Sequence, residues 1–250
     1  MKREQVLFST IAEDALPAAK RCGSGLELAQ FCTAYNMDER FAQTDAEVKT
    51  MLKALSAPVL HGPFNELFPC AIDPKARRLA AERYRQAAEL CPVYGCVKLV
   101  LHGGYNPKLY YPMWYIPESV KFWKSFLTQD PDVTVCLENV FEETPEMLLE
   151  IAEAVDDRRI RLCLDLGHVN AYSAVPAETW LRIWAPYISH FHVHNNPGDA
   201  DMHQCPGEGS LPMEELLHLA EELCPEATYT MEVLEAEKTA KWLEDKGFLT

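Results

Sequence analysis

The chain has 250 residues, of which 23 are Lys or Arg and 38 are Asp or Glu, so its formal net charge is −15. This acidic balance argues against nucleic acids and anionic membranes as partners, because both reward clustered Lys and Arg. With 48% hydrophobic residues the chain can bury a sizeable core, and no change of composition marks a linker. We expect one domain over residues 1–250.

The sequence also lacks the signals of a membrane or exported protein. Its apolar runs are well short of the ~20 residues that a transmembrane helix needs, and none follows the N-terminus as it would in a secretory signal. The 9 cysteines include no CxxC pair, which is typical of reduced thiols rather than of a zinc knuckle. We therefore expect a cytoplasmic protein.

Eight short apolar runs follow one another along the chain, separated by longer amphipathic stretches. Their continuous Val, Leu and Ile are typical of parallel strands that are buried on both faces. Dividing 250 residues among eight runs gives about 31 per unit, the length of one strand plus one helix. The runs span 6–10, 25–31, 57–62, 96–104, 133–140, 160–168, 188–196 and 228–234.

Three of the stretches between the runs carry clear helix-start signals. Asp73 with Pro74, Thr144 with Pro145, and Ser210 each precede an amphipathic segment. Eight strand–helix units predict an α/β protein, a single (β/α)8 TIM barrel. The alternative is an open doubly wound sheet, but such sheets usually have a Gly-rich turn after the first strand, and residues 9–13 contain no glycine.

The ends of the last six runs are rich in His, Asp and Glu. In a barrel, the chemistry lies at the C-terminal ends of the strands. Imidazole and carboxylate together suit Zn, Mn, Fe or Co, and bound cations would remove the repulsion between neighbouring carboxylates. A lone His at a strand end is more often a hydrogen-bonded core residue, so the prediction depends on the whole set. The run ends supply His61, His102, Glu138, Asp165, His192 and Glu232.

Side-chain alternation predicts which residues face the barrel interior, because positions two apart share a face of a strand. His190, His192 and His194 then face inward, while the residues between them face the helices. Lys98 also faces inward, and we expect it to pair with Glu27 below the site, since a buried lysine needs a partner. The alternative is that Lys98 extends to one end of the barrel.

Several segments together resemble the xylose isomerase-like TIM-barrel superfamily, and within it the sugar phosphate isomerase/epimerase and endonuclease IV group. The resemblance covers nearly the whole chain. Single motifs such as LEN are weak, whereas DxxH, HxH with a downstream DxH, and GEG are specific when they occur in this order. The segments are HGPF (61–64), LHGGYNP (101–107), LEN (137–139), DLGH (165–168), HFHVHNN with DMH and PGEG (190–209), and MEV (231–233).

The resemblance implies roles for individual side chains. Glu138, Asp165, His192 and Glu232 match the shared metal site, and in the epimerases the two glutamates also move protons. His168 matches a substrate contact of the epimerases and a metal ligand of the endonucleases, so we count it with the catalytic candidates. The trinuclear zinc site of the endonucleases adds positions that match His61, His102, Asp201 and His203. Expected substrate contacts are Phe64, Tyr105, Asn139, His194 and Glu208.

Two enzymatic functions follow from these matches. The first is a divalent-metal-dependent isomerase or epimerase that acts on a sugar or sugar-like hydroxycarbonyl through an enediolate, with one to three ions. The second is a trinuclear-metal phosphodiesterase like an apurinic-site endonuclease. A metal-binding barrel without turnover is a third possibility. The expected loops 33–47, 105–119 and 195–210 are acidic or aromatic and poor in Lys and Arg, which favours a carbohydrate over a nucleic acid.

Overall fold

Eight parallel strands close into a barrel in the computed structural model, which describes residues 1–129 and 132–249. Each strand lies within one of the expected apolar runs and pairs with its neighbours in sequence, and the first pairs with the last. The (β/α)8 prediction is therefore confirmed over the open sheet. The strands are β1 (Val6–Ser9), β2 (Gly25–Leu28), β3 (Val59–His61), β4 (Lys98–His102), β5 (Thr134–Glu138), β6 (Ile160–Asp165), β7 (Ile188–Val193) and β8 (Thr228–Met231).

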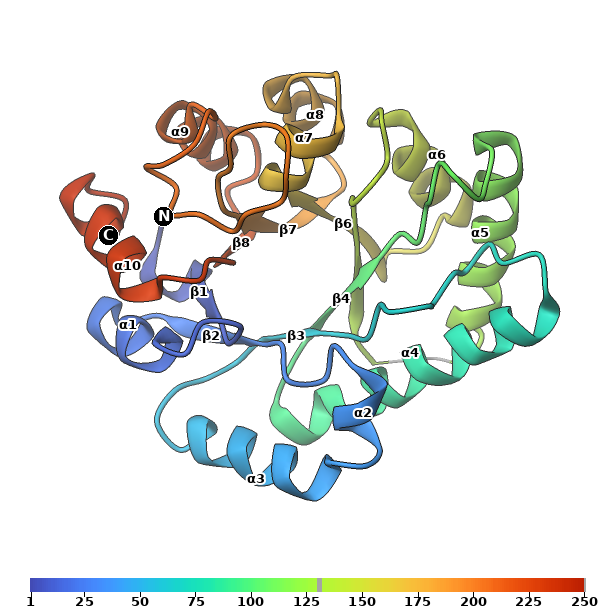
Figure 1. Cartoon of the computed structure of the whole chain (residues 1–250), viewed down its shortest axis with the longest axis horizontal. Coiled ribbons are helices and arrows are strands. Elements are labelled where there is room, and N and C mark those ends of the chain that lie inside the picture. The colour runs from blue at the N-terminus through green and yellow to red at the C-terminus, as the bar shows by residue number, and fades with distance from the viewer. Residues whose placement is uncertain (130–131, 250) are drawn as a thin grey trace.

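The helices surround the ring of strands, and the two chain ends lie near each other beside α10 (Figure 1). No helix within the described residues combines the length and the apolar character needed to span a bilayer. The helices are α1 (Ala15–Cys22), α2 (Ala34–Met37), α3 (Phe41–Leu52), α4 (Pro74–Tyr94), α5 (Pro112–Leu127), α6 (Glu146–Val155), α7 (Leu166–Tyr172), α8 (Ala177–Trp184), α9 (Met213–Leu223) and α10 (Ala236–Asp245), with a 3-10 turn η1 at Arg3–Gln5.

One of the three expected helix starts is where the sequence places it. Asp73 caps α4 by accepting a hydrogen bond from the Lys75 amide at 2.7 Å, with Pro74 in the first turn. Helices α6 and α9 begin later than expected, directly after Pro145 and Pro212. The Ser210 hydroxyl cannot cap α9 because it bonds instead to the Asn170 amide, at 2.9 Å.

Two segments that we expected to be loops are partly helical. Residues 34–37 and 41–52 form α2 and α3, and α5 already begins at Pro112. In α3 only Thr44 and Val48 are buried, so the apolar stripe is too narrow to show in the sequence. The expected aromatic loop 105–119 likewise contains the first turns of α5, whose buried face includes Tyr115.

The barrel interior has an apolar and a polar part. Five strands contribute small or aliphatic side chains to the first part, including Cys136 below Glu138 and Cys163 below Asp165. The other three strands contribute the fully buried Glu27, His190 and Thr230. The main core lies between the strands and the helices, where Phe191 stacks on Tyr229. As predicted, the alternation along β7 therefore directs its histidines into the barrel.

Candidate metal centre

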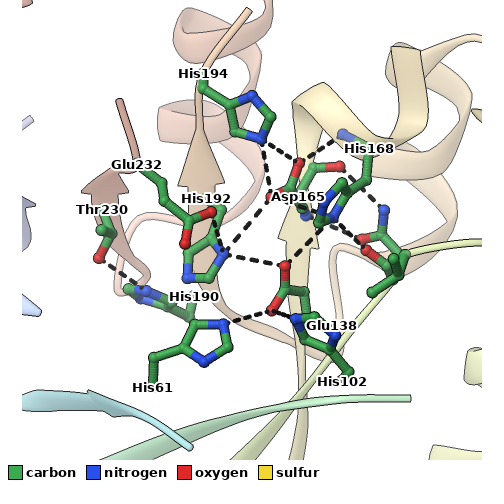
Figure 2. Close-up of polar contacts among 12 residues, drawn as sticks. His61, His102, Glu138, Asp165, His168, His190, His192, His194, Thr230 and Glu232 are labelled. Carbon is green, nitrogen blue, oxygen red and sulfur yellow. Dashed lines mark hydrogen bonds and ion pairs between the residues drawn. The ribbon is translucent and has the colours of Figure 1, made fainter. Parts of the chain in front are cut away.

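Four side chains from the last four strands meet at the mouth of the barrel (Figure 2). His192 occupies the centre, and its Nδ1 atom lies 3.3 Å from Glu138 Oε1, 3.2 Å from Glu232 Oε2 and 3.6 Å from Asp165 Oδ2. All four residues are buried. We call Glu138, Asp165, His192 and Glu232 the central group.

A second set of imidazoles approaches the other oxygen of Glu138. His61, at the end of β3, and His102, at the end of β4, place their Nε2 atoms 3.3 and 3.5 Å from Glu138 Oε2. The two carboxylate oxygens of Glu138 therefore face different neighbours. We call His61, His102 and Glu138 the first group.

A third set is built from α7 and the loop after β7. His168 Nε2 and His203 Nε2 lie 3.3 and 3.1 Å from Asp201 Oδ2. An isolated bridge between Asn195 and Gln204 ties the two ends of this loop together. We call His168, Asp201 and His203 the third group. All nine residues that the sequence singled out as metal ligands are thus brought together, and we call them the nine-residue cluster.

The cluster and the adjacent His194 contain buried polar atoms that make no hydrogen bond within the described part of the chain. They are Glu138 Oε2, His192 Nδ1, His194 Nδ1 and Asp201 Oδ1. Leaving a buried polar atom unpaired costs about 1–3 kcal/mol, so four in one place call for a ligand. Nitrogen and carboxylate ligands at this density fit a divalent transition metal, and several three-residue subsets lie close enough to share an ion.

The charges in the cluster stabilise one another. Burial alone would raise the pKa of Glu138, but His192 and His102 hold it well below the usual range. Burial would lower the pKa of His61, yet the adjacent Glu138 carboxylate raises it to about 9. Burial lowers the pKa of His102 to about 4. Without metal, the cluster therefore retains protons at sites that an ion would occupy.

The metal-free protein should lose stability as the pH rises from 6.5 to 8. Carboxylates outweigh burial and raise the pKa values of His61 and His203 from 6.5 to about 9. A histidine whose pKa is higher in the folded than in the unfolded protein contributes its full stabilisation below pH 6.5. This contribution is lost as the pH approaches 9. We expect the free energy of unfolding to fall by roughly 1–3 kcal/mol, measured by urea titration in a chelator.

This pH window lies below the range in which buried cysteines contribute, since burial raises the pKa of Cys22 from 9.0 to about 11. A His61→Gln variant is the control, and its stability should depend less on pH. Zinc-loaded protein should not lose stability over this range, because the ion replaces the protons. Stability that stays level or rises in the metal-free protein would contradict the charge assignment.

The cluster opens into a cavity of about 480 Å³ that Phe64 and Tyr105 help to line, as expected for substrate contacts. The Phe64 ring stacks on His102 with centroids 4.3 Å apart. A larger cavity, of about 620 Å³, lies outside the barrel between α8 and α9 and contains none of the nine residues. The smaller cavity is therefore the candidate substrate site.

The other three expected substrate contacts lie away from this cavity. Asn139 and His194 are fully buried beneath it, and Glu208 pairs with Lys238 at 2.6 Å. The Asn139 side chain bonds the backbone of Asp165 twice, at 2.9 and 3.0 Å, and so fixes the end of β6. These positions give Asn139 a place in the support of the cluster, whereas His194 lies close enough to Asp201 and His203 to share an ion with them.

His194 packs directly under the third group. Its Nε2 atom lies 3.0 Å from Asp165 Oδ1, and its ring stacks on His203 with centroids 4.2 Å apart. Gly167 makes room for this ring, because a Cβ atom there would lie 2.0 Å from His194 Cε1. Glycine is therefore required at this position of the DLGH segment.

The expected Lys98–Glu27 ion pair is wrong. Both side chains point into the barrel, but Glu27 bonds to His190 and His192, while the Lys98 ammonium reaches the N-terminal end of the barrel and bonds Ser189 O and Thr228 Oγ1. Lys98 is half-buried, so the alternative of a lysine extending to one end describes it better. Sequence reasoning missed the contacts of Glu27 with the histidines, although alternation along β7 does place His190 in the interior.

The closed barrel of eight parallel strands is a TIM barrel. The His, Asp and Glu side chains at its C-terminal mouth are of the kinds that bind metal ions. The chain belongs to the xylose isomerase-like TIM barrel family, whose model matches residues 16–249.

The chain is also similar in sequence to an uncharacterized protein and in fold to solved structures. The uncharacterized protein MJ1311 of Methanocaldococcus jannaschii is 32% identical over 66% of this chain, which spans about 60% of that relative. A D-tagatose 3-epimerase-like protein shares the fold with a TM-score of 0.81 and 22% identity, over 98% of this chain and 97% of its own. The TTHB071 protein from Thermus thermophilus, soaked with ZnCl2, has a TM-score of 0.79 and 24% identity over 98% of both chains.

Proposed function

We propose that this protein is a divalent-metal-dependent isomerase or epimerase of a sugar or sugar-like hydroxycarbonyl. The main support is the position of Glu138 and Glu232, which approach the same His192 nitrogen from β5 and from the end of β8, at 3.3 and 3.2 Å. Two carboxylates that approach one point from different strands can remove a proton and return it elsewhere. The names of similar structures, including an epimerase-like protein, point the same way.

The central group would hold the essential ion, and the first and third groups have the composition to hold two more. When bound, the metal would supply Lewis-acid polarisation of the substrate carbonyl. His192, Asp165, Glu138 and Glu232 fit this role because three carboxylates approach His192 Nδ1, a buried nitrogen that makes no hydrogen bond within the described residues. A soaked zinc salt in a similar structure makes zinc a reasonable first ion to test.

The proton transfers fall to the two glutamates. One carboxylate accepts the proton from the carbon next to the carbonyl, which leaves an enediolate. Return of a proton to the neighbouring carbon gives isomerisation, and return to the opposite face of the same carbon gives epimerisation. His168 lines the cavity, and its Nδ1 donates to the Asn139 carbonyl at 2.9 Å, so its Nε2 edge is held toward the cavity and Asp201.

The wall of the cavity favours an uncharged substrate. Among the described residues that line it, none is Lys or Arg. Aromatic and aliphatic side chains cover much of the wall and suit the faces of a sugar. The cavity thus offers no Lys or Arg partner to a phosphate group.

A second candidate function, metal-assisted phosphodiester hydrolysis, is favoured by one observation. Glu138 links the first and central groups, and the third group lies beside them, so the cluster has more ligands than a single ion needs. Three ions could bind and activate a phosphodiester. The lack of basic residues around the cavity argues against a DNA substrate.

Two assays on the metal-loaded protein separate these functions. In deuterium oxide, we expect deuterium to enter the carbon next to the carbonyl in one member of a panel of ketoses, more readily than in their phosphates. Nicking of a duplex with an abasic site, at near-physiological salt, should stay at background. Efficient nicking without deuterium exchange would overturn the proposal in favour of the hydrolase.

A further inference from the structure

A chain of polar side chains runs through the barrel below the nine-residue cluster, from its N-terminal end to His192. Lys98 Nζ contacts Thr228 Oγ1 at 2.9 Å, and Thr228 Oγ1 lies 2.6 Å from His190 Nδ1. His190 Nε2 lies 2.9 Å from Glu27 Oε2, and Glu27 Oε1 lies 3.1 Å from His192 Nε2. Four different strands contribute these five residues.

The Glu27 carboxylate fixes the direction of these hydrogen bonds. It can only accept, so His190 Nε2 carries a proton and donates it to Glu27 Oε2. Lys98 donates to Thr228 Oγ1, and a second positive charge on His190 would be opposed by this ammonium. His190 is therefore neutral, and its unprotonated Nδ1 accepts from the Thr228 hydroxyl.

Glu27 also sets the direction of its hydrogen bond with His192, a member of the cluster. An ionised carboxylate only accepts hydrogen bonds, and Thr230 also donates to Oε2 of Glu27. The remaining oxygen, Oε1, must accept from His192 Nε2. The proton of His192 that can be lost is then the one on Nδ1, the atom that faces Glu138, Asp165 and Glu232.

We infer that Glu27 is a positioning residue, which holds His192 with Nε2 protonated and Nδ1 directed at the central group, and that Lys98, Thr228 and His190 fix the orientation of Glu27. Glu27 is fully buried, so it acts on any metal only through His192. Partners of this kind orient a metal-binding imidazole and make it more basic. The inference rests on the metal-binding part of the proposed function.

Replacing Glu27 by Gln tests the inference through zinc affinity. The Gln amide nitrogen would face the N–H of either His190 or His192, so one of these two contacts must break. We expect the affinity for zinc alone, measured by competition with a chelator, to fall by about 10–100-fold. An unchanged affinity would overturn the inference.

Glu142→Gln is the matched control. Glu142 is also buried, but it bonds Tyr115 and the Val140 amide and contacts none of the nine residues by a hydrogen bond within the described chain. Its replacement should leave zinc affinity near the wild-type value. Equal losses in both variants would mean that zinc affinity follows general stability, and the inference would fail.

Nitrogen-15 NMR of the histidines gives a second test on the wild-type protein, which does not depend on a variant that folds. We expect His192 to have a protonated Nε2 and a zinc-bound Nδ1, and His190 to be neutral with its proton on Nε2. A proton on His190 Nδ1 would reverse the chain and overturn the inference. So would an unprotonated His192 Nε2, which an ion held by Cys163, His190 and His192 would produce.

The same experiments distinguish a failure of this inference from a failure of the proposed function. If the wild-type protein binds no zinc, the metal-dependent function itself is wrong. If the wild-type protein binds zinc and Glu27→Gln binds it equally well, only the role of Glu27 is wrong.

Discussion

Glu138→Gln should abolish isomerase activity and sharply weaken metal binding. The two oxygens of Glu138 serve separate groups, with Oε1 facing His192 and Oε2 facing His61 and His102. Its amide replacement loses the negative charge and places N–H groups against these imidazoles. The loss of proton transfer alone is worth about 10²–10⁴-fold in turnover, and the loss of metal should take activity to background.

Metal content and deuterium exchange should be measured on the same preparation of this variant. Glu142→Gln again serves as the control, because it removes a similarly buried carboxylate four residues away. Full activity together with full metal content in Glu138→Gln would show that Glu138 is neither a ligand nor a proton carrier.

Glu232→Gln should separate proton transfer from metal binding more cleanly. Glu232 lies just after β8, lines the cavity and approaches His192 Nδ1, but unlike Glu138 it does not join two groups through separate oxygens. We expect turnover to fall by about 10²–10⁴-fold, while the first and third groups still bind zinc. The measurement is deuterium exchange compared with zinc content.

Glu235→Gln is the control for this change, since Glu235 is an exposed residue nearby that pairs with Lys238. It should leave both readings unchanged. If Glu232→Gln exchanges deuterium as fast as the wild-type protein, the second proton carrier must be another group, and the pairing of the two glutamates is wrong.

The sequence was sufficient to predict the barrel and the members of the cluster. Buried parallel strands appear as continuous apolar runs, and a residue such as Asp165 at the end of a run must lie at the mouth once the barrel closes. The parity of β7 correctly placed His190 and His192 inside. These features depend on the local sequence pattern and on the position of strand ends in a closed barrel, so they can be predicted from the sequence.

Contacts between strands far apart in sequence were not predictable in this way. Glu27 and His192 are 165 residues apart, and which of several inward-facing cations Glu27 meets depends on the stagger of strands around the barrel. The expected Lys98 partner was wrong for this reason. The packing of the His194 ring against His203 was also missed, because it depends on close approach to Gly167 rather than on any strand pattern.

Zinc quantification after equilibrium dialysis tests most directly whether the nine-residue cluster is a metal centre. We expect the purified wild-type protein to retain at least one zinc ion per chain, and Glu138→Gln to retain less. A wild-type protein that is folded, has been freed of chelator and still binds no zinc, manganese, iron or cobalt would contradict the proposed metal-dependent function.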